Sequence, residues 1–401
     1  MDFEEYIRQS EPSHKEKAYA WRTAIGLQAV DGLKTSEYLR DTARKHIEGD
    51  IDINEAQQLI RSYYQSKTVR TPEDEEMEEA DKVSANIAKI LGEQSFAFSI
   101  IGFTSIHRRI FDGVFKFAGK IRDYDITKKE WVLNGDTVLY VGHEDIKMSL
   151  EYDLEQEKQF VYKNLSSDNV IEHIAKFVSG IWQIHPFGEG NTRTTAIFTI
   201  KYLRSIGFTV NNDLFADNSW YFRNALVRAN YRNVQKSIEP NITYLIKFFR
   251  NLLMGEHNEL KNRFMVINLP EEWKEKIKQT GQPTGQVTGQ PTVQVTGQVC
   301  EKLLPSSENI TSLIQKMGEE MLTVKQIMER FGLKGRNSFM STYLNPAAKE
   351  HYVSLLYPDR PNHPRQKYYL TVKGSCLYND LKKFKKEQIE KNEKEQEPNI
   401  S

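Results

Sequence analysis

The sequence predicts a mainly α-helical protein: a helical bundle with one β-hairpin, followed by a small unit of helices and strands. Apolar residues recur at three- and four-residue steps through most of residues 98–250, which is the spacing of a helix face. Residues 130–142 instead carry β-branched side chains around Asn134-Gly135, a strong hairpin signal. Alternating runs near residues 352–371 predict the strands of the smaller unit.

Four helices of the bundle can be placed individually. Residues 171–181 show the stripe of an amphipathic helix, with an N-cap available at one of residues 166–168. Three further helices are predicted at residues 194–208, 220–231 and 242–253, the first of them ending near a glycine.

Length and composition exclude several classes of protein. A chain of 401 residues predicts two or three folded units. With 55 basic and 55 acidic side chains, the zero net charge argues against a protein that coats nucleic acid or a membrane surface. No run approaches the roughly 18 apolar residues of a membrane helix, and Cys300 and Cys376 form no zinc spacing. We therefore expect a cytoplasmic protein that binds no membrane.

Changes in composition divide the chain. Residues 280–299 repeat Gly, Thr, Gln and Pro and predict a linker, so we expect the chain beyond Thr280 to be dispensable for chemistry. Residues 73–81 (EDEEMEEAD) predict a solvated acidic loop. The predicted segments are 1–72, N-terminal helices; 73–97, acidic linker and leading helix; 98–250, main bundle; 251–279, helical extension; 280–299, linker; 306–374, second folded unit; and 375–401, charged tail.

The run HPFGEGNTR, His185 to Arg193, lies between two predicted helices. Pro186 ends the first helix, and Gly188 and Gly190 allow a tight turn and a close approach to a ligand. The amides that open the next helix are free donors at the positive end of its dipole, so they predict an anion site. A histidine for proton transfer, a carboxylate for Mg²⁺ and an arginine for phosphate stand within the same run, which indicates phosphoryl or nucleotidyl transfer.

This run resembles the Fic (Fido) signature HxFx[DE]GNGRxxR, and the resemblance extends over about residues 98–250, including TSIHRRIFDGVFKFAGKIR. It implies a helical bundle that transfers AMP from ATP, with Mg²⁺, to a Tyr, Thr or Ser hydroxyl of a target protein or of itself. His185 would be the general base, Phe187 an anchor in the core and Glu189 the Mg²⁺ ligand. Residues 130–142 would be the flap that holds the target by strand addition. The candidate phosphate-binding residues are Gly188, Glu189, Gly190, Asn191, Thr192 and Arg193.

Two positions depart from the signature. Thr192 replaces its second glycine and puts a Cβ beside the phosphates, and Ala196 replaces the second arginine, which normally binds the γ-phosphate. Transfer of UMP, of another nucleotide or of a whole phosphate therefore stays an alternative. Base specificity is expected from the side chains of Tyr221, Asn224 and Tyr231.

The two ends of the chain carry further resemblances. Residues 23–56 are similar to small antitoxin domains that inhibit Fic enzymes through a [ST]xxxE[GN] helix, with Asp31 at the glutamate position; an ordinary helical lid is the alternative. Residues 306–374, with a capping box at Thr323 and Gln326, resemble a winged helix of the type appended to many Fic proteins. The cations available for phosphate contacts are Arg336, Arg360, Arg365 and Lys367.

The expected partners are ATP, a protein hydroxyl, and either DNA or a protein at residues 306–374, with self-association left open. A rival function is a catalytically weak protein that regulates transcription or acts as a scaffold through residues 306–374.

Overall fold

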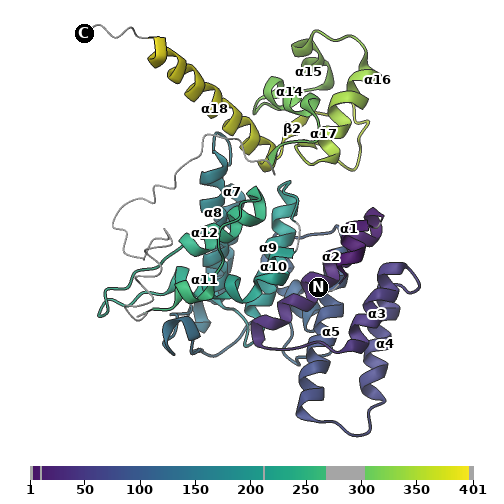
Figure 1. Cartoon of the computed structure of the whole chain (residues 1–401), viewed down its shortest axis with the longest axis vertical. Helices are drawn as coiled ribbons and strands as arrows, with labels where there is room; N and C mark the ends of the chain where they lie inside the picture. Colours follow the sequence, from purple (N-terminus) through teal and green to yellow (C-terminus); the bar gives the residue numbers. More distant parts are fainter. Residues whose placement is uncertain (1–2, 10, 211–212, 268–302, 397–401) are drawn as a thin grey trace.

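The computed structural model describes residues 3–9, 11–210, 213–267 and 303–396, which form a mainly helical molecule (Figure 1). The predicted fold class is therefore confirmed. A large hydrophobic core joins the N-terminal helices to the main bundle, and a smaller one lies within residues 310–377. None of the helices in these ranges has both the length and the apolar character that crossing a bilayer requires.

The helices before the predicted bundle begin and end as follows: α1 Glu4–Gln9, α2 Pro12–Gly26, η1 Leu27–Asp31, α3 Glu37–Glu48, α4 Ile53–Gln65 and α5 Pro72–Gly92. The bundle itself contains α6 Ile100–Ile110, η2 Trp131–Leu133, η3 His143–Asp145, α7 Ile146–Gln159, α8 Ser167–Ile184, α9 Asn191–Ser205, α10 Asp213–Asp217, α11 Ser219–Asn230, α12 Thr243–Phe249, η4 Arg250–Met254 and η5 Asn262–Met265.

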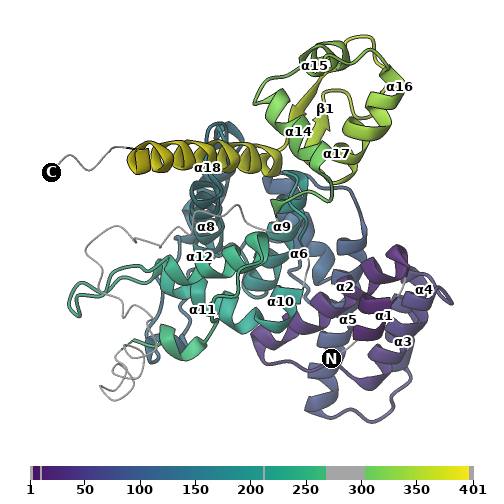
Figure 2. The ribbon, with the colours of Figure 1, turned by 45° about the horizontal axis from the view of Figure 1, so that its top comes forward.

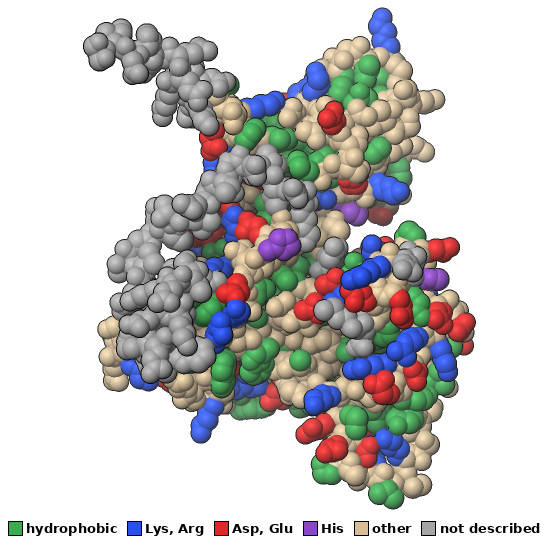
Figure 3. All heavy atoms as spheres, viewed as in Figure 1, with side chains coloured by type: hydrophobic (Ala, Val, Ile, Leu, Met, Phe, Trp, Pro, Cys, Tyr) green, Lys and Arg blue, Asp and Glu red, His purple; other side chains and the backbone are tan. Residues whose placement is uncertain are grey.

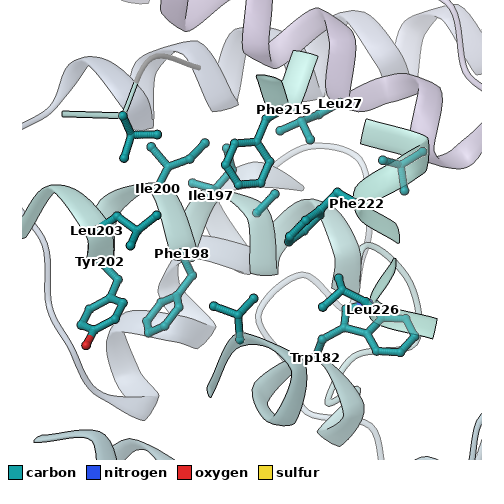
Figure 4. Close-up of a cluster of buried hydrophobic side chains, with 14 of the residues drawn as sticks. Leu27, Trp182, Ile197, Phe198, Ile200, Tyr202, Leu203, Phe215, Phe222 and Leu226 are labelled. Atoms are coloured by element: carbon teal, nitrogen blue, oxygen red, sulfur yellow. The ribbon is translucent and has the colours of Figure 1, made fainter. Parts of the chain in front are cut away.

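The N-terminal helices share the core of the bundle. Figure 4 shows Leu27, from η1, beside Phe215 and Phe222 of α10 and α11, and all three side chains are buried. Asp31 at the end of η1 also pairs with Arg193 in the first turn of α9, so this packing brings η1 to the start of α9.

The acidic run at residues 73–81 is helical, which corrects the prediction of a loop. Thr71 and Asp74 form a capping box, and Pro72 occupies the first helical position of α5. Carboxylates in a first turn are favoured by the helix dipole. Lys67 binds Asp74 at 2.6 Å, and Lys82 binds Glu78 at 2.5 Å. Local charge pairing thus offsets the like-charge repulsion that we expected to prevent a helix.

The predicted hairpin forms its turn but no paired strands. Asn134 and Gly135 are both left-handed (φ 53° and 87°), as a tight hairpin turn requires. The amide of Ile267 donates instead to the Val132 carbonyl at 2.9 Å, and the Asn134 side chain donates to the Ile267 carbonyl at 2.9 Å. One backbone group of the first predicted strand, the Val132 carbonyl, is therefore used by another segment, and η2 replaces that strand.

The predicted helical extension at residues 251–279 is also corrected where it is described. Residues 255–261 are not helical, and only the short η4 and η5 turns lie within residues 251–267. The remainder of that segment and the predicted linker at 280–299 lie outside the described residues.

The C-terminal unit contains α14 Glu308–Met317, α15 Val324–Phe331, α16 Arg336–Phe339, η7 Met340–Leu344, α17 Asn345–Lys349, β1 Val353–Leu355, β2 Tyr368–Leu370 and α18 Val372–Gln396. The capping box at Thr323 and Gln326 and the stop at Gly332 are confirmed. The strands pair antiparallel, with Ser354 opposite Tyr369. The predicted charged tail is helical through Gln396, because α18 begins with residues such as Leu377 that pack inside the unit.

This unit packs directly on the bundle, across the outer end of α8 (Figures 1 and 2). The N-cap residue of α8, Ser166, makes no capping bond through its side chain, and Asp380 of α18 accepts from the Ser167 amide at 3.1 Å. A side chain at Gly207, just after α9, would meet Thr371 at 2.6 Å. The unit therefore contacts the outer ends of both α8 and α9, and the dispensability of the chain beyond Thr280 for chemistry stays a prediction.

We expect Asp380→Ala to destabilise the start of α8 by about 1 kcal/mol, the usual cost of losing a cap. Hydrogen exchange of the first amides of α8, together with chemical unfolding, measures this. Asp359→Ala, which removes an exposed carboxylate of the same unit, is the matched control. Equal exchange in the two variants would show that Asp380 does not cap the helix.

Candidate active site

The loop from His185 to Gly190 has the helix-loop-helix form that the sequence predicts. His185 ends α8 in a left-handed conformation (φ 49°), and Gly190 precedes α9 in another (φ 76°). A Cβ at Gly190 would lie 2.2 Å from the ring of Phe111, so only glycine fits there. The chain thus re-enters a helix with its first amides turned toward the loop.

Asn191 and Phe187 hold the loop from within. The Asn191 side chain accepts from the Phe187 amide at 3.0 Å and donates to the Phe187 carbonyl at 2.7 Å. The Phe187 ring is buried and stacks on His107 with ring centroids 3.7 Å apart. Phe187 is therefore the core anchor that we expected. The Asn191 side chain is engaged inside the loop, which leaves its backbone amide as the group free to meet a phosphate.

His107 supports the loop from α6, a role that sequence reasoning missed. Its Nδ1 accepts from the Gly119 amide at 2.8 Å, so Nε2 carries the proton and donates to the Glu189 carbonyl at 3.0 Å. Burial lowers the pKa of His107 to about 4. A neutral, fixed imidazole thus links α6 to the loop.

Arg122 is a second missed residue, although it ends the leading segment used for the resemblance. Its buried guanidinium donates from Nε to the His185 carbonyl at 2.9 Å and from Nη1 to the Tyr124 carbonyl at 2.6 Å, and it also donates to Val141. Its amide donates to the Pro186 carbonyl at 2.9 Å. Arg122 therefore links the loop by hydrogen bonds to both ends of the segment at residues 124–141.

His185 has the electrostatic properties of a general base. Its ring is buried between Tyr140 and Trp182, with Nδ1 3.3 Å from the Trp182 carbonyl. Burial, and then the charge of Lys128, hold the pKa of His185 well below its ordinary value. A proton on Nδ1 facing that carbonyl leaves Nε2 unprotonated and able to accept one.

A cavity of about 570 Å³ opens beside the loop. Of the predicted site residues, it brings together Asp31, Glu189 and Arg193. Its charged lining consists of three acids and three bases: Asp31, Glu79, Glu189, Lys128, Arg193 and Arg223. The acidic and basic side chains pair with one another, so the net charge of the lining is zero. An anionic ligand must therefore displace carboxylates from the basic side chains before it can bind them.

Glu189, the expected Mg²⁺ ligand, is 55 % exposed and accepts from Lys128 Nζ at 2.9 Å. No cluster of three His, Cys, Asp or Glu ligands occurs anywhere in the described ranges. Mg²⁺ commonly uses one or two carboxylates together with substrate phosphates. Glu189 fits such a site only when a nucleotide completes the ligand set and Lys128 moves away.

Arg193 is only 2 % exposed, and its partners come from residues before the bundle. Its Nε lies 2.8 Å from Asp31 Oδ2, its Nη2 lies 3.0 Å from Glu79 Oε1, and its Nη1 donates to Gln28 at 2.9 Å. The carboxylate at position 31 therefore pairs with Arg193, one of the candidate phosphate-binding residues.

The two departures from the signature have structural explanations. Thr192 accepts from Trp182 Nε1 at 3.0 Å, so its side chain points toward α8 rather than toward the loop opening, which corrects our expectation. Ala196 is completely buried in the hydrophobic core. The position at which the signature has its second arginine is therefore occupied in this chain by a small side chain that packs in the core.

Of the residues predicted to contact the base, Tyr221 and Asn224 lie on α11 and Tyr231 directly follows it. Tyr221 donates to the Tyr244 carbonyl at 3.2 Å, Asn224 donates to Asn262 at 2.8 Å, and Tyr231 donates to Asp136 at 2.6 Å. None of the three lines the cavity, whereas Trp220 and Arg223 do. The periodicity of the sequence predicted that this segment is helical. It did not indicate which face of α11 lines the cavity, because both faces carry aromatic residues.

Comparison with known proteins agrees with this geometry. Residues 98–203 match the Fic/DOC family model, and residues 308–371 match the model "Filamentation induced by cAMP protein Fic-like, C-terminal domain". The protein adenylyltransferase VbhT of Bartonella schoenbuchensis is 24 % identical over 183 residues, which are 45 % of this chain and 36 % of that protein. The chain thus matches about a third of the length of that relative.

Two solved structures are also similar. A Fic family protein from Desulfovibrio desulfuricans G20 has a TM-score of 0.40 at 14 % identity, covering 92 % of this chain and 90 % of the other. The N-terminal Fic domain of a putative cell filamentation protein, a VirB-translocated Bep effector protein, from Bartonella quintana has a TM-score of 0.36 at 18 % identity. It covers 46 % of this chain and 84 % of the other. This chain contains a Fic/DOC domain and a Fic-like C-terminal domain.

Proposed function

We propose that this chain, which contains a Fic/DOC domain at residues 98–203, is a protein adenylyltransferase that transfers AMP from ATP to a protein hydroxyl. One observation carries the proposal: the buried, neutral His185 stands one loop away from the free amides that open α9, with Arg193 in the first turn. A base and an anion site in one loop are what attack on a phosphate requires.

In the proposed reaction, the target hydroxyl oxygen attacks the α-phosphorus of ATP as its proton passes to His185 Nε2. The bond from the α-phosphorus to the bridging oxygen of the β-phosphate breaks, and diphosphate leaves. The amides of residues 190–193 would hold the α-phosphate, and Arg193, once released from its carboxylates, would hold the outer phosphates. Magnesium, when bound to Glu189 and the phosphates, would neutralise part of their charge.

The cavity also suggests where the base and the target lie. Trp220 offers an aromatic face, and Arg223 lies 5.7 Å from its centre while holding the carboxylate of Glu130 at 3.0 Å. We place the base against this pair. The target segment would lie along residues 137–141, where the Leu139 side chain is 85 % exposed and the backbone makes no strand pairing.

The test is to incubate the full chain and a cell lysate with ATP labelled on the α-phosphate or on the γ-phosphate, and to identify modified residues by mass spectrometry. We expect an α-label and an added AMP. A γ-label would identify phosphate transfer instead, and a stronger signal from UTP would identify UMP transfer. If no nucleotide labels protein, even when Asp31 and Glu79 are both replaced, the chain is not a transferase.

A further inference from the structure

A second cavity, of about 500 Å³, shares no lining residue with the cavity beside the loop. Its walls come from α4, α5 and the end of α6, so it lies where the N-terminal helices meet the bundle. Four of its lining residues carry side-chain amides, three are basic, one is acidic and one is apolar. Cavities of this size hold small molecules in other proteins.

The charged part of this lining is mostly basic. It contains Arg61, Lys89 and Arg109 against a single acid, Asp112. On the face of the N-terminal helices that Figure 3 shows, by contrast, Lys and Arg side chains lie among Asp and Glu side chains. In a chain of zero net charge, a cavity with three cations and one carboxylate indicates an anionic ligand.

Lys89, in the last turn of α5, has amide rather than acidic partners. Its Nζ donates to the side-chain oxygens of Asn54 at 2.8 Å and Gln57 at 3.3 Å, and it makes no ion pair with any carboxylate of the described residues. The N-cap carboxylate of α4, Asp52, accepts instead from the backbone amides of Asn54 and Glu55. An ammonium group has three N–H donors, so Lys89 keeps one donor and an uncompensated charge for a ligand.

The two arginines of the cavity lie on different walls, Arg61 on α4 and Arg109 on α6. Arg61 Nη2 pairs with Asp112 at 3.0 Å, and Arg109 Nη2 pairs with Glu93 at 2.6 Å. Ion pairs that are exposed to this degree contribute only about 0 to 1 kcal/mol each. Since a guanidinium has five N–H donors, each arginine can also bind a second anion at little cost.

Asn86, a buried residue of α5, connects the walls of the cavity. Its side chain accepts from Gln57 Nε2 at 2.6 Å and donates to the carbonyls of Ile110 at 3.0 Å and Asp112 at 3.2 Å. Gln57 lies on α4 and Ile110 ends α6, so one side chain links the two helices that carry the arginines. The three cations are therefore held near one another before any ligand binds.

We infer that this cavity binds a small anion that carries a phosphate group, held by Arg61, Lys89 and Arg109. A phosphate offers several acceptor oxygens to separate cations, and its geometry matches that of a guanidinium. The described lining residues include no aromatic side chain on which a nucleobase could stack, so the site favours free phosphate, diphosphate or a phosphate monoester over a nucleotide. Because its walls belong to both the N-terminal helices and the bundle, the bound anion would stabilise their contact. The inference does not depend on the proposed enzymatic activity.

The test is hydrogen exchange of the full chain, read by mass spectrometry, in rising concentrations of inorganic phosphate, diphosphate or glucose 6-phosphate. Potassium chloride at equal ionic strength is the reference, since salt alone screens exposed charges. We expect slower exchange in peptides that cover residues 54–61, 86–90 and 109–112. Equal protection by phosphate and by the ester would identify phosphate alone as the recognised group, and stronger protection by the ester would identify a phosphate monoester. No protection of these peptides by any of the three probes, or protection confined to residues 185–193, would overturn the inference.

Lys89→Gln should raise the probe concentration that gives half of the full protection by about tenfold or more, because it removes a charge-assisted hydrogen bond. Arg109→Gln removes a cation from the α6 wall and should have a similar effect, so it tests the site independently if the first variant does not fold. The matched control is Arg108→Gln, which removes the same charge from the neighbouring exposed position of α6, outside the cavity. The control should keep the midpoint of the unchanged protein. An equal shift in Arg108→Gln would show that the probe responds to overall charge and would refute a site in the cavity.

Discussion

His185→Ala is expected to lower AMP transfer by about 10²- to 10⁴-fold while nucleotide affinity changes little. The reason is a division of roles in the loop. In the proposed reaction His185 would accept the proton of the attacking hydroxyl, whereas the amides of residues 190–193 and the side chains of Glu189 and Arg193 would hold the phosphates. Single-turnover transfer and nucleotide binding by calorimetry separate the two effects.

The control for this variant is His257→Ala, which removes an exposed histidine with no contact to the loop. Its transfer rate should equal that of the unchanged protein. Transfer at the unchanged rate by His185→Ala would remove His185 from the mechanism. A loss of affinity as large as the loss of rate would instead assign it a structural role in the loop.

The dependence of transfer on pH follows from the environment of His185. The base is active when neutral, and burial together with Lys128 lowers its pKa. The neutral form therefore persists as the pH falls through the ordinary histidine value of about 6.5. We expect the rate of the chemical step to stay level down to that pH and to fall only below it. A decline centred near 6.5 would mean that the titrating base is a solvent-exposed group.

The sequence predicted those elements whose signals are local. The capping box at Thr323 and the end of α8 at His185 depend on residues a few positions apart, and the structure confirms both. The Fic signature likewise brought the loop residues together because the loop is continuous in the chain. In each case the residues that determine the local structure lie close together in the sequence.

What the sequence did not predict depends on contacts between distant segments. The first strand expected before Asn134 is replaced by η2, and Ile267, more than a hundred residues later, bonds the Val132 carbonyl and the Asn134 side chain. Arg122 and His107 hold the loop through carbonyl oxygens, which any residue type supplies. No pattern of side chains in the loop could therefore have indicated these partners.

The inhibitory interaction was predicted only in part. The resemblance placed Asp31 at the inhibitory position, but Ala196 stands where the signature has its second arginine, so the signature indicated no partner for Asp31. The structure shows that Asp31 pairs with Arg193, and it adds Glu79 of α5, which lay in the segment interpreted as an acidic loop. Two carboxylates thus share one guanidinium, an arrangement that neither resemblance implied.

Two carboxylates hold Arg193, so we expect the double variant Asp31→Asn with Glu79→Gln to be far more active than either single variant. Each carboxylate is more than two-thirds buried, and each contact should stabilise the closed form by about 1 to 1.5 kcal/mol after solvent screening. Each single variant should then raise the transfer rate by about five- to twelvefold, and the double variant by about 30- to 140-fold.

The amide replacements keep the shape of each side chain, so the effect isolates charge. Glu78→Gln is the matched control, because Glu78 lies beside Glu79 on α5 but pairs with Arg70 and Lys82 instead. Transfer and ATP affinity should rise together in the double variant, since ATP must displace the carboxylates before its phosphates reach Arg193. Full activation by Asp31→Asn alone, with no effect of Glu79→Gln, would show that Glu79 only supports the fold and that η1 alone closes the site. If the double variant is folded and its rate is unchanged, then Arg193 does not bind the outer phosphates, and the cavity is closed by some interaction other than this charge pairing.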